Sequence, residues 1–443
     1  MLCLFLKLRN FRLLFKRVLI LSVMVGFSLP PIAQADKKKI SSDESQLPLE
    51  ELRTFTRVYD HVRNAYVKEV SDTQLLEYAI KGMIAELDPH SAYLDKEAFA
   101  ELQATTSGEF GGVGLEVGLD EGVIKVITPL DGSPSQKAGI KPGDIIVRLD
   151  DQSMKGKTLS DAARIMRGPK GAPIKISVQR RGVDEVLDIV IIRDLIQVQS
   201  VSIKPLAERY LYIRIAQFQV NTGKDLVARL RDSFKQYPKT KGLILDLRNN
   251  PGGVLQASIE VADAFLTDGL VAYTQGRTDN SNINYNTTPG DISAGLPLVV
   301  LINSGSASAS EVVAGALQDQ KRAVIMGTRS FGKGSVQTVI PISEDRAIKL
   351  TTALYYTPNG RSIQAKGIEP DVRLEANTAA ADNKMTTSEA DLVGHIPNSS
   401  GDEATASESE VVINDDILKD SQVLDAVNLL KGLHILDKQA RNP

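Results

Sequence analysis

Apolar residues recur at helical spacing near the start of the chain. Two stretches, 47–70 and 71–88, predict helices, and Ser71 or Asp72 is the expected N-cap of the second. Together with the polar residues before them, they make 36–104 a predicted helical N-terminal segment.

The pattern changes between residues 105 and 193 to short β-like runs separated by glycines. One helix is predicted among them, at 158–168, with Thr158 and Asp161 spaced as a capping box. The expected strands are 111–117, 122–130, 144–150 and 173–181. We therefore predict a small β-rich domain with a single helix.

Strands and helices alternate from residue 200 to 375, which predicts an α/β domain with a largely parallel sheet. The expected strands are 210–218, 242–248, 297–303, 322–327 and 347–358, and the helices are 222–237, 254–266 and the end of 303–320. Residues 376–412 are rich in Ala, Ser, Thr and acids without periodicity, and are predicted to be a disordered acidic linker. The last segment, 413–443, carries an amphipathic helix at 420–433.

The composition is that of a globular protein with two or three domains: 443 residues, 42% hydrophobic, 24% charged, with a net charge of −3. This balance gives no sign of a nucleic-acid partner. The N-terminus differs from the rest. Five basic residues, the apolar run 18–29 and Ala-Gln-Ala at 33–35 predict a signal peptide over residues 1–35. An uncleaved membrane anchor is the alternative.

Cleavage after Ala35 changes the formal charge from −3 to −8, because it removes five basic residues and no acidic ones. It also removes Cys3, the only cysteine. The mature chain then has no thiol nucleophile, disulfide or cysteine metal site, and we expect neither a metal nor a cofactor.

Residues 303–320 contain four serines ahead of a predicted helix. A serine hydroxyl needs a base to become a nucleophile. The four histidines are the usual candidates, but none lies within 200–375, which argues against a Ser-His-Asp triad. They are His61, His90, His395 and His434.

Lys333 is the alternative base, since burial can lower the pKa of a lysine toward neutrality. Gly332 and Gly334 flank it, so neighbouring backbone can approach closely, and the strand before it follows the serine-bearing helix. The alternative is that Lys333 is an ordinary lysine of a surface turn, and the two features above weigh against it.

The third element is a loop after the predicted buried strand 242–248, which contains Gly252 and Gly253 and leads into a helix. Such a loop can present backbone N–H groups to the oxyanion of an acyl-transfer intermediate. The alternative is an ordinary strand-to-helix turn. A nucleotide site is disfavoured, because no Walker lysine motif and no G-x-G-x-x-G is present.

Four stretches, in order and spacing, resemble the carboxyl-terminal processing (tail-specific) serine peptidases: "GGVGLEV…SPSQKAGIKPGDIIVRLD", "DLRNNPGG", "GSASASEVVAGALQD" and "RAVIMGTRSFGKGSVQ". The similarity runs from about residue 47 to 372, with the last helix in addition. It implies an α/β peptidase core with a crotonase/ClpP-like sheet and helices, an inserted PDZ domain and a helical N-terminal segment. Ser330 departs from the usual threonine.

The resemblance implies a Ser–Lys dyad that works without histidine. In this sequence Ser308 matches the nucleophile, Lys333 the base and Gln337 a residue that orients the lysine. The oxyanion hole is expected from the N–H groups of Ala309 and of one glycine in Gly252–Gly253. The neighbouring serines are then small packing and capping residues, namely Ser306 and Ser310.

The β-rich domain resembles a PDZ domain, in which a glycine loop binds a C-terminal carboxylate and the peptide adds as a strand. The implied peptide-binding residues are Gly112, Val113, Gly114, Leu115 and Arg167. A glycine bulge is the alternative for this loop. Arg167 is expected either to act as a switch between peptide binding and the peptidase domain or to be a plain helix-terminal arginine.

These expectations describe a serine endopeptidase, exported to the periplasm or elsewhere outside the cytoplasm, that recognises unstructured or C-terminally tagged protein substrates. An adaptor protein, membrane association and an oligomer stay open. A catalytically silent PDZ scaffold or chaperone and a crotonase-like acyl-transfer enzyme are the alternatives. A histidine-dependent PDZ protease lacks a suitably placed histidine.

Overall fold

A computed structural model describes residues 48–120, 122–206, 209–374, 388–392, 394–396 and 420–441. The predicted signal peptide, residues 1–35, lies outside them. The chain divides into two compact units, Met1–Val70 and Ser71–Pro443. In the described residues, none of the helices is long and apolar enough to cross a membrane.

The first unit contains α1 (Leu49–Ala65), whose residues are almost all exposed. The second begins with α2 (Asp72–Ala85), for which Ser71 is the N-cap: its hydroxyl accepts the N–H of Gln74. Both helices were predicted. The sequence did not predict β1 (Ala92–Leu94) and α3 (Lys96–Ser107), which follow them.

The β-rich domain is an antiparallel sheet in the order β3-β4-β5-β7-β8 beside a β2–β9 pair. Its core is formed by branched residues that alternate along the strands, such as Ile124 and Val126. The capping box of Thr158 and Asp161 opens α5 as predicted. The elements are β2 (Glu109–Gly112), β3 (Leu115–Asp120), β4 (Val123–Pro129), α4 (Pro134–Lys137), β5 (Ile145–Leu149), β6 (Gln152–Ser153), α5 (Leu159–Met166), β7 (Pro173–Gln179), β8 (Leu187–Ile192) and β9 (Asp194–Gln197).

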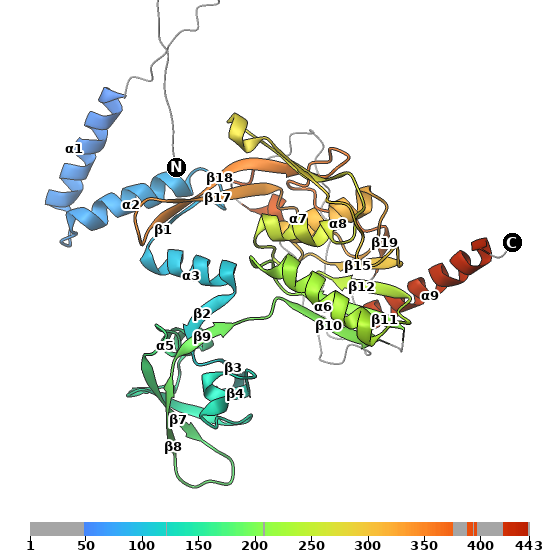
Figure 1. The fold of residues 1–443 in the computed structure, drawn as a ribbon. Coiled ribbons are helices and arrows are strands. Elements are labelled where there is room, and N and C mark those ends of the chain that lie inside the picture. Colours follow the sequence, from blue (N-terminus) through green and yellow to red (C-terminus); the bar gives the residue numbers. More distant parts are fainter. Residues whose placement is uncertain are drawn as a thin grey trace, which may run out of the picture. The chain divides into compact units, whose positions relative to one another are not determined.

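The main sheet of the α/β domain has the order β10-β11-β12-β15-β16-β19 (Figure 1). Only β10 runs antiparallel to its neighbour, so the predicted largely parallel sheet is confirmed. The strands are β10 (Val201–Leu206), β11 (Tyr210–Ile215), β12 (Gly242–Asp246), β15 (Leu298–Ile302), β16 (Val324–Gly327) and β19 (Val372–Arg373).

Helices cover both faces of this sheet (Figure 1). Leu243 and Leu245 on β12 pack with three helices on one face, whereas Ile244 between them packs with the C-terminal helix on the other. This alternation explains why β12 is apolar throughout. The helices are α6 (Thr222–Gln236), α7 (Leu255–Asp263), α8 (Ala309–Asp319) and, on the second face, α9 (Ser421–Arg441).

A second, antiparallel sheet has the order β1-β18-β13-β14, with β17 also paired to β18. Of these strands, only β18 was predicted. Through β1, the residues that follow α2 are therefore joined to the α/β domain by strand pairing. The strands are β13 (Leu270–Gly276), β14 (Ile283–Asn286), β17 (Ser335–Pro341) and β18 (Ala347–Tyr356).

One short stretch corrects the prediction of disorder over 376–412. The 3₁₀ turn η2 (Glu389–Asp391) contains a fully buried glutamate, Glu389, whose carboxylate contacts His90 at 2.8 Å. A polar segment without periodicity is ordered here because it is hydrogen-bonded to other parts of the chain, which composition does not reveal.

Candidate active site

The four serines of 303–320 differ in their surroundings. Ser306 and Ser310 are fully buried, and their hydroxyls donate to the backbone carbonyls of Leu247 at 2.8 Å and Asn250 at 2.9 Å. They are packing residues, as expected. Ser308, in contrast, is only half-buried, so part of its surface stays exposed.

Ser308 has a backbone conformation that non-glycine residues rarely adopt, with φ 54° and ψ −112°. Such strain persists only where the surrounding structure imposes it, and it concentrates at functional sites. Here the residue is the N-cap of α8, directly after the turn that follows β15. A strained strand-to-helix turn is the arrangement that exposes the nucleophile in α/β-hydrolases.

Gly252 lies directly against this turn. A Cβ on Gly252 would be 2.9 Å from the Cβ of Ser308 and 3.0 Å from the amide nitrogen of Ala309, so no side chain fits there. Its φ of +100° also favours glycine. The structure therefore brings the two-glycine loop and the serine turn together, as the sequence predicted.

The hydrogen bonds of this loop distinguish its two glycines. The N–H of Gly252 donates to the side chain of Asn250 at 2.9 Å. Gly253 forms a parallel bridge with Phe218, in which the N–H groups used are those of Phe218 and Val254. Within the described residues, the N–H groups of Gly253 and Ala309 have no hydrogen-bond acceptor.

Lys333 lies in the loop between β16 and β17, and close backbone contacts hold this loop. A Cβ on Gly334 would be 2.6 Å from the amide nitrogen of Gln364, and one on Gly332 would be 3.1 Å from that of Gly367. The expected close approach around Lys333 is therefore present. Burial is the main cause that lowers the pKa of Lys333, and the charge of Lys349 lowers it further.

The sequence analysis missed Glu311, which connects the serine turn to the lysine loop. Its carboxylate is fully buried and accepts the N–H of Ser308 at 2.7 Å and the N–H of Lys333 at 2.9 Å. It also accepts the N–H of Gly332 at 2.7 Å and the hydroxyl of Ser330 at 2.6 Å. The available signal was the Ser-x-x-Glu spacing at the start of α8.

Burial raises the pKa of Glu311 to about 7, although its hydrogen bonds act in the opposite direction. Among the described residues no cation forms an ion pair with this carboxylate, and its four hydrogen-bond donors are neutral N–H and hydroxyl groups. Tyr355 adds a second link, because its buried hydroxyl donates to the carbonyl oxygens of Ser308 and Lys333. Burial keeps the pKa of Tyr355 far above its ordinary value, so it remains a donor.

Gln337 was expected to orient Lys333, and among the described residues no hydrogen bond joins the two side chains. The amide of Gln337 donates to the hydroxyls of Ser335 at 2.9 Å and Thr351 at 3.4 Å. Gln337 and Ser335 both lie on β17, and a β-bulge interrupts the strand just before Gln337. Its role toward Lys333 stays a prediction.

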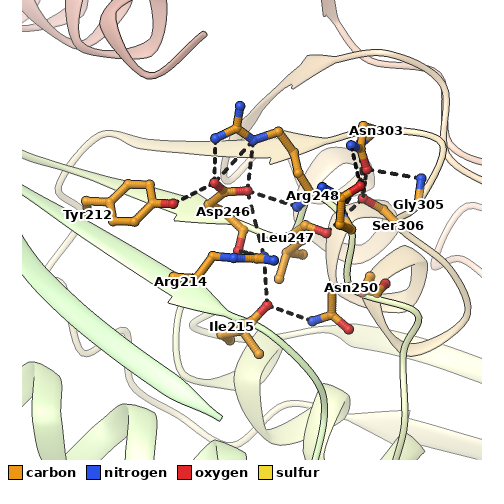
Figure 2. Close-up of polar contacts among 12 residues, drawn as sticks. Tyr212, Arg214, Ile215, Asp246, Leu247, Arg248, Asn250, Asn303, Gly305 and Ser306 are labelled. Atoms are coloured by element: carbon orange, nitrogen blue, oxygen red, sulfur yellow. Dashed lines mark hydrogen bonds and ion pairs between the residues drawn. The ribbon is translucent and has the colours of Figure 1, made fainter. Parts of the chain in front are cut away.

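A second buried carboxylate anchors the start of the two-glycine loop (Figure 2). Asp246, at the end of β12, accepts from the hydroxyl of Tyr212 at 2.7 Å and from the guanidinium of Arg248 at 2.6 Å. Arg248 also contacts Asp420 at 2.7 Å and Gln422 at 2.9 Å, at the start of α9. Burial acts against the charge of Arg248, but these hydrogen bonds and carboxylates raise its pKa.

In the PDZ-like domain, α5 contacts β3, and the predicted loop Gly112–Leu115 leads into β3. Gly114 has a φ of +72°, and its carbonyl accepts the N–H of Leu130 at 2.9 Å. An arginine that the sequence analysis did not single out, Arg193, is buried and donates to the carbonyls of Ile165 and Met166 at the end of α5. It caps that helix.

Arg167 follows α5 directly. Its guanidinium lies 3.6 Å from the carboxylate of Glu101 on α3 and 5.3 Å from the ring centre of Phe110. These contacts are with the N-terminal segment and strand β2, not with the α/β domain toward which a salt bridge was expected, and the role of Arg167 as a switch stays a prediction. In the described ranges, no cluster of His, Cys, Asp and Glu could hold a metal ion.

Three family models match the chain. They are "Peptidase family S41" over residues 209–374, "PDZ domain" over 126–180 and "Activating protease CtpB N-terminal domain" over 27–98.

The chain is also similar to curated proteins and solved structures. The "Carboxy-terminal-processing protease" of Bartonella bacilliformis is 43% identical over 414 residues, which cover 93% of this chain and 94% of that protein. The "Carboxy-terminal processing protease CtpB" of Bacillus subtilis is 35% identical over 79% of this chain and 71% of its own. The structure of a photosystem II D1 C-terminal processing protease is 31% identical and covers 74% of this chain and 87% of that one, with a TM-score of 0.44.

Proposed function

Because this chain belongs to the carboxy-terminal processing proteases of peptidase family S41, we propose that it is an endopeptidase with Ser308 as nucleophile and Lys333 as general base. The family inferred from the sequence motifs is confirmed, as is the PDZ domain within the chain. A crotonase/ClpP-like core stays a prediction.

The observation that carries this proposal is the carboxylate of Glu311, which accepts the backbone N–H of both Ser308 and Lys333. A single buried group thereby fixes the two residues relative to one another. In the first step, neutral Lys333 accepts the proton of the Ser308 hydroxyl while the serine oxygen attacks the peptide carbonyl. The lowered pKa of Lys333 favours the neutral amine that this step requires.

The tetrahedral intermediate carries its negative charge on the former carbonyl oxygen. The N–H groups of Ala309 and Gly253 are the proposed donors to this oxygen, because both are without an acceptor in the described structure, whereas that of Gly252 is used by Asn250. The Lys333 ammonium then returns its proton to the leaving amine. An acyl-enzyme on Ser308 remains and is hydrolysed by water.

A PDZ domain implies binding of peptides or C-terminal substrate tails. We place the tail along β3, between this strand and α5, with its carboxylate at the loop Gly112–Leu115. Arg167 is a candidate switch residue, since it connects the end of α5 to Glu101 of α3. Cleavage of tailed substrates by Arg167→Ala should be impaired while its Ser308 site stays reactive.

Export to the periplasm or beyond is part of the proposal and rests on the sequence of residues 1–35. The intact mass of the native protein tests it, and a mass that still includes residues 1–35 would contradict cleavage. Nothing in the similarities supports an adaptor protein or membrane association, and neither is proposed.

The deciding experiment is turnover of a casein-like substrate by the purified mature protein without coenzyme A. Ser308→Ala and Lys333→Ala should each lose nearly all activity, and the double variant should be little worse, since the two residues act as one unit. Lys333→Arg should not restore activity, because a guanidinium does not deprotonate in proteins.

Ser304→Ala is the matched control, because Ser304 is half-buried in the same turn. Activity in Lys333→Ala would overturn the dyad. A wild-type protein that binds tails without cutting them would instead indicate a silent scaffold.

A further inference from the structure

Behind the lysine loop, three segments that are remote in the sequence meet at one carboxylate. Glu389, in η2, is fully buried. The ring of His90, from the N-terminal segment, lies 2.8 Å from both oxygens of this carboxylate. The side chain of Gln364 donates to it at 3.0 Å.

The same contacts reach the backbone on both sides of Lys333. The N–H of Glu389 donates to the carbonyl of Phe331 at 3.1 Å. The carbonyl oxygen of the Gln364 side chain accepts the N–H of Gly334 at 2.9 Å. Glu389 therefore holds the loop at two places. It contacts Phe331, two residues before Lys333, directly, and it contacts Gly334, one residue after Lys333, through Gln364.

Glu311 holds the same loop at other groups, the N–H groups of Gly332 and Lys333. The two carboxylates differ in origin. Glu311 belongs to the helix that carries the nucleophile, whereas Glu389 follows the last strand of the peptidase sheet. The peptidase fold alone thus supplies one support of the lysine loop, and a short C-terminal segment supplies the other.

We propose that Glu389 is a positioning residue for the general base, and that His90 holds its carboxylate in place. This inference rests on the proposed role of Lys333. Glu389 takes no proton in the reaction. It fixes the loop and places a negative charge near the ammonium that forms when Lys333 accepts the Ser308 proton, as the carboxylate of a catalytic triad does for its imidazolium.

Several charged groups lie near Lys333, and the sign of each charge determines whether it raises or lowers the pKa of the lysine. The negative charges of Glu389, Glu311 and Asp88 raise the pKa of Lys333, while burial, the largest effect, and Lys349 lower it. Hydrogen bonds lower the pKa of Asp88 despite its burial, so it stays ionised. Tyr355 contacts the lysine through the backbone carbonyl only.

The test is the pH dependence of kcat/KM for a fluorogenic peptide, measured on the full mature chain. Glu389→Gln keeps the size of the side chain and removes its charge. The ammonium form of Lys333 is then less stable, so the acid limb should move to lower pH. The plateau should fall about tenfold, because the base is weaker and its loop less well held.

Glu369→Gln is the matched control, since Glu369 is an exposed glutamate five residues after Gln364. Its profile should equal that of the wild type. An unchanged limb and plateau in Glu389→Gln would overturn the proposal.

If Glu389→Gln does not fold, two substitutions of His90, the partner of Glu389, test the same proposal. Gln can place an N–H donor where the Nε2 of His90 lies, whereas Phe cannot. His90→Phe should lower the plateau about tenfold and His90→Gln should restore much of it. Equal, wild-type profiles for both would contradict the proposal.

The failure of this inference and that of the proposed function give different results. If Lys333→Ala stays active, Lys333 is not the general base, and the proposed function fails. Inactive Ser308→Ala and Lys333→Ala, together with wild-type profiles for the Glu389 and His90 variants, would leave the dyad intact and reject only the role of Glu389.

Discussion

Two buried carboxylates support the two halves of the active site, and they do so with different partners. Asp246 holds the start of the two-glycine loop through the cation of Arg248 and the hydroxyl of Tyr212. Glu311 holds the turn of Ser308 and the loop of Lys333 through neutral donors.

This difference matters because a buried charge is stabilised more fully by an opposite charge than by neutral donors. The pKa of Glu311 rises to about 7, which places its titration near neutral pH. The two-glycine loop is therefore fixed by an ion pair, whereas the turn of Ser308 and the loop of Lys333 are fixed by a carboxylate that can still take up a proton.

The largest effect is expected on the ion-paired side. Arg248→Met removes the 2.6 Å ion pair of Asp246 and leaves it the longer contact with Arg214, at 3.9 Å. It also removes the contacts of the guanidinium with Asp420 and Gln422 at the start of α9. Breaking one partner of a buried pair should lower the free energy of unfolding by about 4 kcal/mol. Urea denaturation measures this loss.

Arg373→Met is its control, because Arg373 is exposed and pairs with the exposed Glu369. It should change the same free energy by less than about 1 kcal/mol. Equal losses in the two variants would show that the Asp246 pair is no stronger than a surface pair.

The next largest effect is a dependence of the free energy of unfolding on pH, which should come from Glu311 and not from Asp246. The pKa of Glu311 is raised in the folded state, so the folded protein binds the proton more tightly than the unfolded chain. Its contribution to stability is full below pH 4.5 and is lost as the pH rises to about 7, with a total of about 3 kcal/mol.

Activity should change in the opposite direction. Ionised Glu311 accepts all four of its donors, and Lys333 loses its proton as the pH rises, so kcat/KM should increase through pH 7. Urea unfolding and kinetics at pH 5 and pH 7.5 measure both trends. If Glu311→Gln shows the same fall in stability with pH as the wild type, the fall is caused by the titration of another group.

Replacing Glu311 by Gln should lower kcat about a hundredfold, or about 2.7 kcal/mol. Each oxygen of Glu311 accepts two hydrogen bonds, so an amide –NH₂ would face two donors. Circular dichroism should show a folded protein. Glu344→Gln, at an exposed position, is the control, and near-equal kcat values would contradict the role of Glu311.

The smallest effect is expected from Tyr355→Phe. It removes the hydroxyl that links the carbonyls of Ser308 and Lys333 but leaves the Glu311 contacts intact. Thermal unfolding should show a loss of about 1 kcal/mol, typical of one hydrogen bond. A loss of activity as large as that of Glu311→Gln would mean that the hydroxyl, rather than the carboxylate, joins the two loops.

The parts of the site that were predictable from the sequence are local. Gly252 and Gly253 in the loop after a buried strand, and the serine run before a helix, are short patterns with a direct structural meaning. The main sheet was predictable for the same reason, since strands such as β12 are uniformly apolar.

The missed parts depend on contacts between distant residues. His90 and Glu389 are 299 positions apart, and no local pattern pairs them. Strand β17 mixes polar and apolar residues and is largely exposed, and it is held in place by its pairing with β18. Glu311 was within reach, because its spacing from Ser308 is that of a capping box.

The strained backbone of Ser308 also concerns how such an enzyme evolves. A glycine at this position would adopt the φ of 54° without cost, while alanine keeps the Cβ that makes it unfavourable. Selection for heat resistance alone should therefore favour Ser308→Gly, with a gain of about 1 kcal/mol, and discard the nucleophile. Persistence of serine at this position in a population would then record continued selection for turnover.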